Sequence, residues 1–172
     1  MNKSRTVLAF ATAALVVALG SPAVAAPAPA PVAGKGAGPA HCVLVLDGMK
    51  AGESTSHVSL HQCFNGPDAS ARAAAAVPRA AAQTELMTWA EDADWGGAYT
   101  KVYGNAGPCD AAGYSFSPNS WWSTHLSSLL VDGGCTKAFL SGPRGNGTFG
   151  RSVSYVGDTL NDAVTYVKIW RG

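Results

Sequence analysis

The sequence predicts an all-β protein, an antiparallel β-sandwich of two similar units that follows a small disulfide-stapled hairpin. Three observations carry this prediction. A pattern of aromatic strand, glycine turn, aromatic strand and polar segment occurs twice after Glu85. Glycines mark almost every chain reversal, and Tyr, Trp, Val and Thr are enriched in the short segments between them. Four cysteines follow an N-terminal export signal, and that combination favours disulfides.

The first 25 residues are predicted to be a signal peptide. Lys3 and Arg5 precede the apolar run Val7–Leu19, and residues 23–25 supply the small side chains that a signal peptidase reads. A transmembrane helix is excluded because this run is well short of the roughly 20 apolar residues needed to span a bilayer. We therefore expect a secreted, extracellular protein.

Charge argues against several classes of partner. Removal of Lys3 and Arg5 with the signal peptide leaves 10 basic residues against 11 acidic ones, a net charge near −1. Such a chain offers no basic face for nucleic acid or an anionic membrane. We expect a monomer that binds neither.

The cysteines allow three pairings, of which we favour Cys42 with Cys63 and Cys109 with Cys135. Each of these pairs falls within one compositionally distinct segment. Each would close a loop of about 20 to 25 residues, worth roughly 3 kcal/mol. A metal site is disfavoured because no Cys-x-x-Cys occurs and export favours disulfides.

The elements before the sandwich differ in composition. Residues 26–40 are rich in alanine and proline and predict a flexible leader. Residues 41–64 predict the stapled hairpin, because an apolar run over 42–46 indicates a buried strand and 56–61 alternates with a strand's period of two.

The segment from 65 to 84 is an alanine-rich connector. Asp68 is placed to cap a helix, and Pro78 would interrupt it, so a short helix and a linker both remain open. The sandwich itself is expected over 85–172.

The repeated unit resembles the Greek-key motifs of βγ-crystallin domains. The resemblance is carried by the Asp94-Trp95-Gly96-Gly97 turn, the Tyr103-Gly104 step and the two polar segments, and it covers about residues 86–172. Small secreted actinobacterial members, which include metalloprotease-inhibitor and killer-toxin-like proteins, are the most similar. The resemblance implies a two-motif Greek-key β-sandwich.

It also implies calcium binding by two polar segments, here called the first arch (123–128) and the second arch (161–166). The family motif reads Asn/Asp, Asn/Asp, any, any, Ser/Thr, Ser, and two such motifs in exchanged positions share each ion. The implied ligands are Asn161, Asp162 and Thr165 in the second arch and Ser123 and Ser127 in the first. Oxygen atoms of these kinds suit Ca²⁺.

Both arches depart from that motif. Tyr166 replaces the final serine of the second arch, and Ser123 and Thr124 replace the acidic or amide pair of the first. Loss of anionic oxygens implies weak calcium binding, with dissociation constants of about 10⁻⁴ to 10⁻³ M. Alternatively, both arches are strand-start turns whose hydroxyls and amides satisfy backbone groups.

A second function is inhibition of an extracellular protease. Residues 141–146 carry one long basic side chain, Arg144, between glycines, and it would anchor in an acidic specificity pocket. The alternative is a long mobile turn.

An enzyme is not expected. The chain lacks the Gly-x-Ser-x-Gly, His-Glu-x-x-His, P-loop and dinucleotide motifs. Glu91, Asp92 and Asp94 crowd one turn rather than facing each other across a cleft, as glycoside cleavage requires. His57 and His61 have no acidic third ligand nearby and do not predict a zinc site.

Tryptophans offer a sugar-binding alternative through Trp121, Trp122 and Trp170. Trp122, however, immediately precedes the first arch, where the resemblance implies a buried aromatic. Trp95, at a turn, is the better candidate for exposure.

Overall fold

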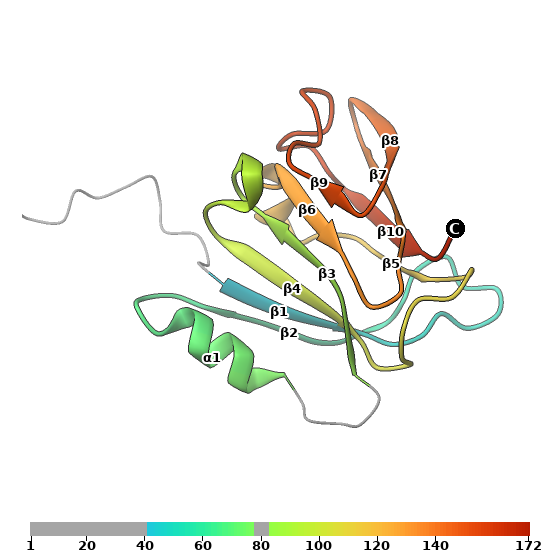
Figure 1. The fold of residues 1–172 in the computed structure, drawn as a ribbon, viewed down its shortest axis with the longest axis horizontal. Coiled ribbons are helices and arrows are strands. Elements are labelled where there is room, and N and C mark those ends of the chain that lie inside the picture. The colour runs from blue at the N-terminus through green and yellow to red at the C-terminus, as the bar shows by residue number, and fades with distance from the viewer. Residues whose placement is uncertain (1–40, 78–82) are drawn as a thin grey trace, which may run out of the picture. The chain divides into compact units, whose positions relative to one another are not determined.

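The computed structural model describes residues 41–77 and 83–172, which form two β-sheets with little helix (Figure 1). The predicted signal peptide (1–25), the leader (26–40) and Pro78 lie outside the described residues. None of the described helices is long and apolar enough to cross a membrane. The strands are β1 (His41–Leu46), β2 (Val58–Phe64), β3 (Thr84–Ala90), β4 (Tyr99–Gly104), β5 (Tyr114–Phe116), β6 (Ser128–Val131), β7 (Lys137–Gly142), β8 (Gly145–Phe149), β9 (Ser152–Val153) and β10 (Tyr166–Trp170). The helices are α1 (Ala69–Ala76) and the 3₁₀ turns η1 (Ala93–Trp95) and η2 (Trp122–Thr124).

The two sheets share one strand order. The first sheet runs β2-β1-β4-β3-β6-β9 and the second runs β5-β10-β7-β8. With the β1–β2 hairpin set aside, the first sheet has the order β4-β3-β6-β9. Read from its other edge, the second sheet has the order β8-β7-β10-β5. The unit of strands β3, β4, β5 and β6 is therefore equivalent in position to the unit of strands β7, β8, β9 and β10, as the doubled sequence pattern predicts.

The third strand of each unit pairs within the other unit's sheet. β5 pairs with β10 through Ser115 and Lys168, and β9 pairs with β6 through Val153 and Leu129. Figure 1 shows β5 beside β10 and β9 beside β6. Neither sheet is completed by a contiguous stretch of chain.

Aromatic side chains from both sheets form the main core. Trp89 of β3 lies 5.2 Å, ring centroid to ring centroid, from Phe116 of β5 and 5.6 Å from Trp122. All three are buried, so the predicted burial of Trp122 is confirmed, and Trp95 is 41% exposed as expected. Aromatic rings of this size supply much of the apolar area that such a core removes from water.

The N-terminal hairpin has the predicted strands and disulfide. Cys42 and Cys63 lie opposite each other in the β1–β2 register and are bonded, and the second predicted disulfide, Cys109–Cys135, is also present. β1 additionally pairs with β4 in parallel, so one pairing departs from the expected antiparallel arrangement.

Both faces of β1 are covered, which explains its uninterrupted apolar run. Leu44 and Leu46 face the main core, whereas Val43 and Val45 pack in a second cluster with Ala73 of α1. A strand buried on both faces is expected to lose the alternation of apolar and polar residues.

The connector contains a helix, which settles the question the sequence left open. Asp68 is the N-cap residue of α1, in the predicted position, but its side chain makes no capping hydrogen bond. Burial of Ala69 and Ala73 instead fixes α1 on the β1–β2 hairpin. Tertiary packing of this kind supplies most of the stability of an eight-residue helix.

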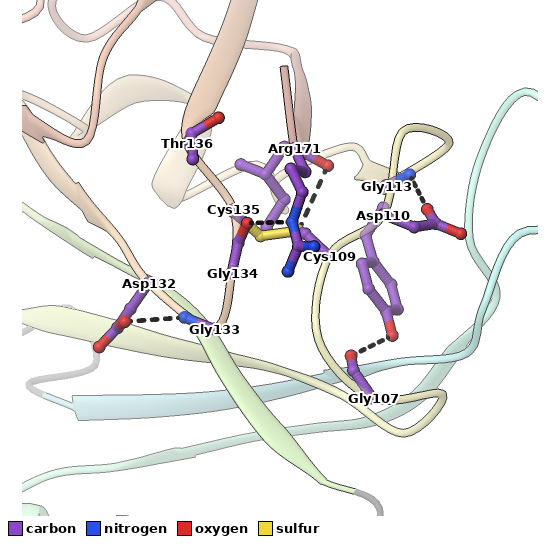
Figure 2. Close-up of a disulfide and its surroundings, with 12 residues drawn as sticks. Gly107, Cys109, Asp110, Gly113, Asp132, Gly133, Gly134, Cys135, Thr136 and Arg171 are labelled. Carbon is purple, nitrogen blue, oxygen red and sulfur yellow. Dashed lines mark hydrogen bonds between the residues drawn. A yellow bond between two sulfur atoms is a disulfide. The ribbon is translucent and has the colours of Figure 1, made fainter.

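The second disulfide joins the loop after β4 to the turn after β6 (Figure 2). Around it, Cys109 N donates to Gly133 O (2.8 Å) and Arg171 N donates to Asp110 O (2.8 Å). Gly113 N donates to the Asp110 carboxylate (2.8 Å), which closes the turn before β5. Arg171 Nε also donates to Gly134 O (3.4 Å), so the C-terminal end of the chain is tied to both loops.

Gly113 is expected to be intolerant of a side chain. Its φ is +70°, and an added Cβ would lie 2.0 Å from Ile169 O. We expect Gly113→Ala to lower the free energy of unfolding by about 2–4 kcal/mol, because the backbone must shift at a strained position. Urea unfolding measures this. Gly150→Ala is the control, since nothing lies within 4 Å of its added Cβ, and equal losses in the two variants would contradict the account.

Candidate metal centre

The two arches occupy equivalent places in the fold. The first leads from η2 into β6, and the second leads from a turn at 157–163 into β10. Each therefore precedes the last strand of its unit. Residues at such strand starts can offer side-chain oxygens and still leave the ladder bonds of the strand intact.

Backbone hydrogen bonds bring the arches into contact. Asp162 N donates to Leu126 O (3.2 Å), which joins the second arch to the first. Ser127 N donates to Ala90 O (3.0 Å), and Ser127 O accepts from Val156 N (2.9 Å). Asp162 and Ser127, two of the predicted ligands, thus lie on adjacent segments.

The second arch presents polar oxygens at this junction. Asp162 has φ +56° and is exposed, and its carboxylate accepts a hydrogen bond from Asn161 Nδ2 (2.9 Å). Asn161 Oδ1 is buried and meets no hydrogen-bond donor among the residues that the structure describes. A buried acceptor without a donor is suited to a cation.

The remaining predicted ligands, Ser123 and Thr165, bond to backbone groups near them instead. Ser123 Oγ donates to Ser120 O (2.9 Å), and Thr165 Oγ1 donates to Ser141 O (3.3 Å). Both hydroxyls thereby serve local backbone groups, as the alternative interpretation of the arches expects. Of the predicted ligands, Asp162 and Ser127 are the ones on the segments that the Asp162 N to Leu126 O bond joins.

A buried serine that the ligand assignment missed fixes the turn beside the first arch. Ser128 Oγ donates to Asp92 O (2.6 Å) and accepts from Trp95 N (3.1 Å), and Ser128 is fully buried. Asp94 and Trp95 both have positive φ (54° and 61°), an uncommon conformation for non-glycine residues. A serine among apolar residues at a strand start is the signal that could have indicated this role.

Charged side chains of both signs lie near the second arch. The Tyr155 hydroxyl donates to Asp158 Oδ1 (2.6 Å), and this bond raises the pKa of the phenol. The charges of Asp158 and Asp162 act in the same direction, whereas that of Arg144 opposes them. Two carboxylates and one guanidinium therefore share this part of the surface.

The predicted inhibitory side chain is turned toward its own chain. Arg144 Nε donates to Thr159 O (3.2 Å), and its Nη2 donates to Asn161 O. The loop is short, because Gly142 and Gly145 pair in the β7–β8 ladder and leave two residues at the turn. Arg144 lies on the second arch rather than projecting from a long loop.

The histidines are engaged elsewhere. His57 Nδ1 lies 3.0 Å from Asp47 Oδ2, and His125 stacks on Trp121 with ring centroids 4.0 Å apart. Within the described ranges, Cys42, His61 and Cys63 are close enough to share a metal, but the two thiols form the first disulfide.

The acidic side chains of the turn at 91–94 lie on one short segment. Glu91 Oε2 accepts a hydrogen bond from Ala98 N (3.2 Å) within the same turn. Asp92 and Asp94 flank η1 on that turn.

Comparison with known proteins adds no relative. No family model, no curated protein and no solved structure matches this chain. The case for a function therefore rests on the geometry above.

Removal of the Ser128 hydroxyl tests how the turn is held. Ser128→Ala leaves Asp92 O and Trp95 N without their partner, so we expect a loss of about 1–3 kcal/mol in the free energy of unfolding. Urea unfolding followed by tryptophan emission measures it. Ser123→Ala, at a partly exposed site whose hydroxyl bonds to Ser120 O at the surface, should cost less than about 0.5 kcal/mol. A Ser128→Ala variant as stable as Ser123→Ala would contradict this role.

Proposed function

We propose that the protein is a secreted, non-enzymatic βγ-crystallin-like module that binds one Ca²⁺ weakly at the junction of its two arches. The observation that carries the proposal is the hydrogen bond from Asp162 N to Leu126 O, which joins the backbones of the two arches next to Ser127, the residue that follows Leu126. The ion would stabilise the folded sandwich rather than take part in a reaction.

The topology supports the family assignment. The exchange of β5 and β9 between the sheets gives two four-stranded units in equivalent order, as expected for paired Greek keys that complete each other's sheet. The two disulfides fit an oxidising compartment, which supports the predicted export.

The oxygen set suits a weak calcium site. Asp162 would supply one carboxylate, Asn161 an acceptor without a donor and Ser127 a hydroxyl. Ca²⁺ takes six to eight oxygens, and few anionic ligands place affinity toward the range of extracellular modules. A single carboxylate therefore supports binding at millimolar calcium.

The contacts of Arg144 do not favour inhibition of an extracellular protease as a second function. A protease-binding arginine must enter a pocket of the enzyme, but Arg144 is hydrogen-bonded to carbonyls of its own chain. Withdrawal of the side chain would leave those carbonyls without this donor.

Calcium should raise the melting temperature, and Asp162 should be required. For a dissociation constant of about 10⁻⁴ M, 10 mM Ca²⁺ is a hundredfold excess and stabilises by about 2.7 kcal/mol. That corresponds to a rise of about 5–10 °C for a domain of this size. Scanning calorimetry of the oxidised protein, with calcium and with chelator, measures it.

The variants decide where the ion binds. Asp162→Ala should abolish the shift, whereas Asp158→Ala removes a neighbouring carboxylate outside the arches and should keep it. If calcium leaves the native protein's melting temperature unchanged, or if both variants respond equally, the proposed site is wrong.

A further inference from the structure

The β7–β8 turn is pressed against the second arch. An added Cβ at Gly142 would lie 1.7 Å from Ala163 O, and one at Gly145 would lie 2.8 Å from Thr159 Cγ2. Only residues without a side chain allow this approach. Arg144, one of the two turn residues between these glycines, therefore lies against the segment that leads into the second arch.

That segment exposes carbonyl oxygens that its own turns do not use. Within 157–163, Leu160 N and Asn161 N both donate to Gly157 O, and Ala163 N donates to Leu160 O. The carbonyls of Thr159 and Asn161 instead accept from the guanidinium of Arg144. Like the last carbonyls of a helix, they favour a positive group.

Arg144 supplies the positive charge that an oxygen-lined site otherwise takes from a metal ion. An arginine stays protonated at all ordinary pH values, and its planar fork of N–H groups can satisfy two carbonyls at once. Asp158 and Asp162 lie close enough for their charges, together with that of Arg144, to act on Tyr155. Thr159 O and Asn161 O therefore line a position that already holds a cation.

We propose that the guanidinium of Arg144 is the resident cation at the Thr159 and Asn161 carbonyls, a position beside the junction site that is formed without metal. An exogenous Ca²⁺ then binds there only when the guanidinium is removed. This inference rests on the proposed function, because it adds a second position, filled by Arg144, beside the calcium site at the junction of the arches. The native protein should bind one ion per chain.

Removal of Arg144 should open the second position. In Arg144→Ala we expect the melting temperature in chelator to fall by about 3–6 °C, because two carbonyls lose their donor. Titration calorimetry with CaCl₂ should show two ions per chain instead of one, and calcium should restore part of the lost melting temperature.

Arg151→Ala is the matched control. Arg151 carries the same charge on an exposed side chain that lies 3.6 Å from Asp132, away from the arch. This variant should keep one ion per chain and the calcium response of the native protein. A gain in calcium binding equal to that of Arg144→Ala would show a general charge effect and overturn the proposal.

A second variant separates the loss of the Arg144 charge from a loss of folding. Arg144→Gln keeps an amide donor for the carbonyls but has no charge, so it should fold and bind a second ion. If the folded Arg144 variants bind as many ions as the native protein, Arg144 only caps a turn and the inference is wrong. Two ions in the native protein would also overturn it.

The proposed function and this inference fail separately. If the native protein binds no ion and Arg144→Ala binds one, the junction site is wrong, whereas the assignment of Arg144 stands.

Discussion

The exchange of β5 and β9 between the two sheets is the constraint on which the rest of the structure depends. Phe116 belongs to the first unit in sequence but lies in the second sheet, where it contacts Trp89 across the core. Val153, from the second unit, pairs in the first sheet. Neither unit can bury its apolar face alone, so the two must fold around one shared core. The disulfides then limit the freedom of segments that this core has already brought together.

The same exchange creates the candidate metal centre. Because each third strand crosses to the other sheet, the segment that follows it returns past the opposite unit, and the two arches meet at Asp162 and Leu126. Neither arch resembles a complete site by itself. The position of the carboxylate is a consequence of strand order, and it is reinforced by the positive φ of Asp162, which the surrounding contacts maintain.

The two units have equivalent strands but different turns. In the first unit the turn is wide, and buried Ser128 holds two residues in a left-handed conformation. In the second unit the turn has two residues, and Arg144 reaches from it to the carbonyls of Thr159 and Asn161. The two units have the same strand order because the buried backbone groups of each strand must be hydrogen-bonded. The turns carry the polar chemistry in which the two halves differ.

The sequence alone determined the local elements. The disulfide pairs, the N-terminal hairpin and the repeated strands followed from spacing, period and residue type, because these depend on neighbours along the chain. The burial of Trp122 followed from the resemblance to a known family. Only the tertiary structure decided that β1 pairs in parallel with β4, that residues 69–76 form a helix, and that Arg144 donates to the carbonyls of Thr159 and Asn161. Each of these depends on which surface remains uncovered once distant strands have paired. No local pattern records that surface, since the hydrophobic effect is non-directional and favours any partner that removes the apolar area from water.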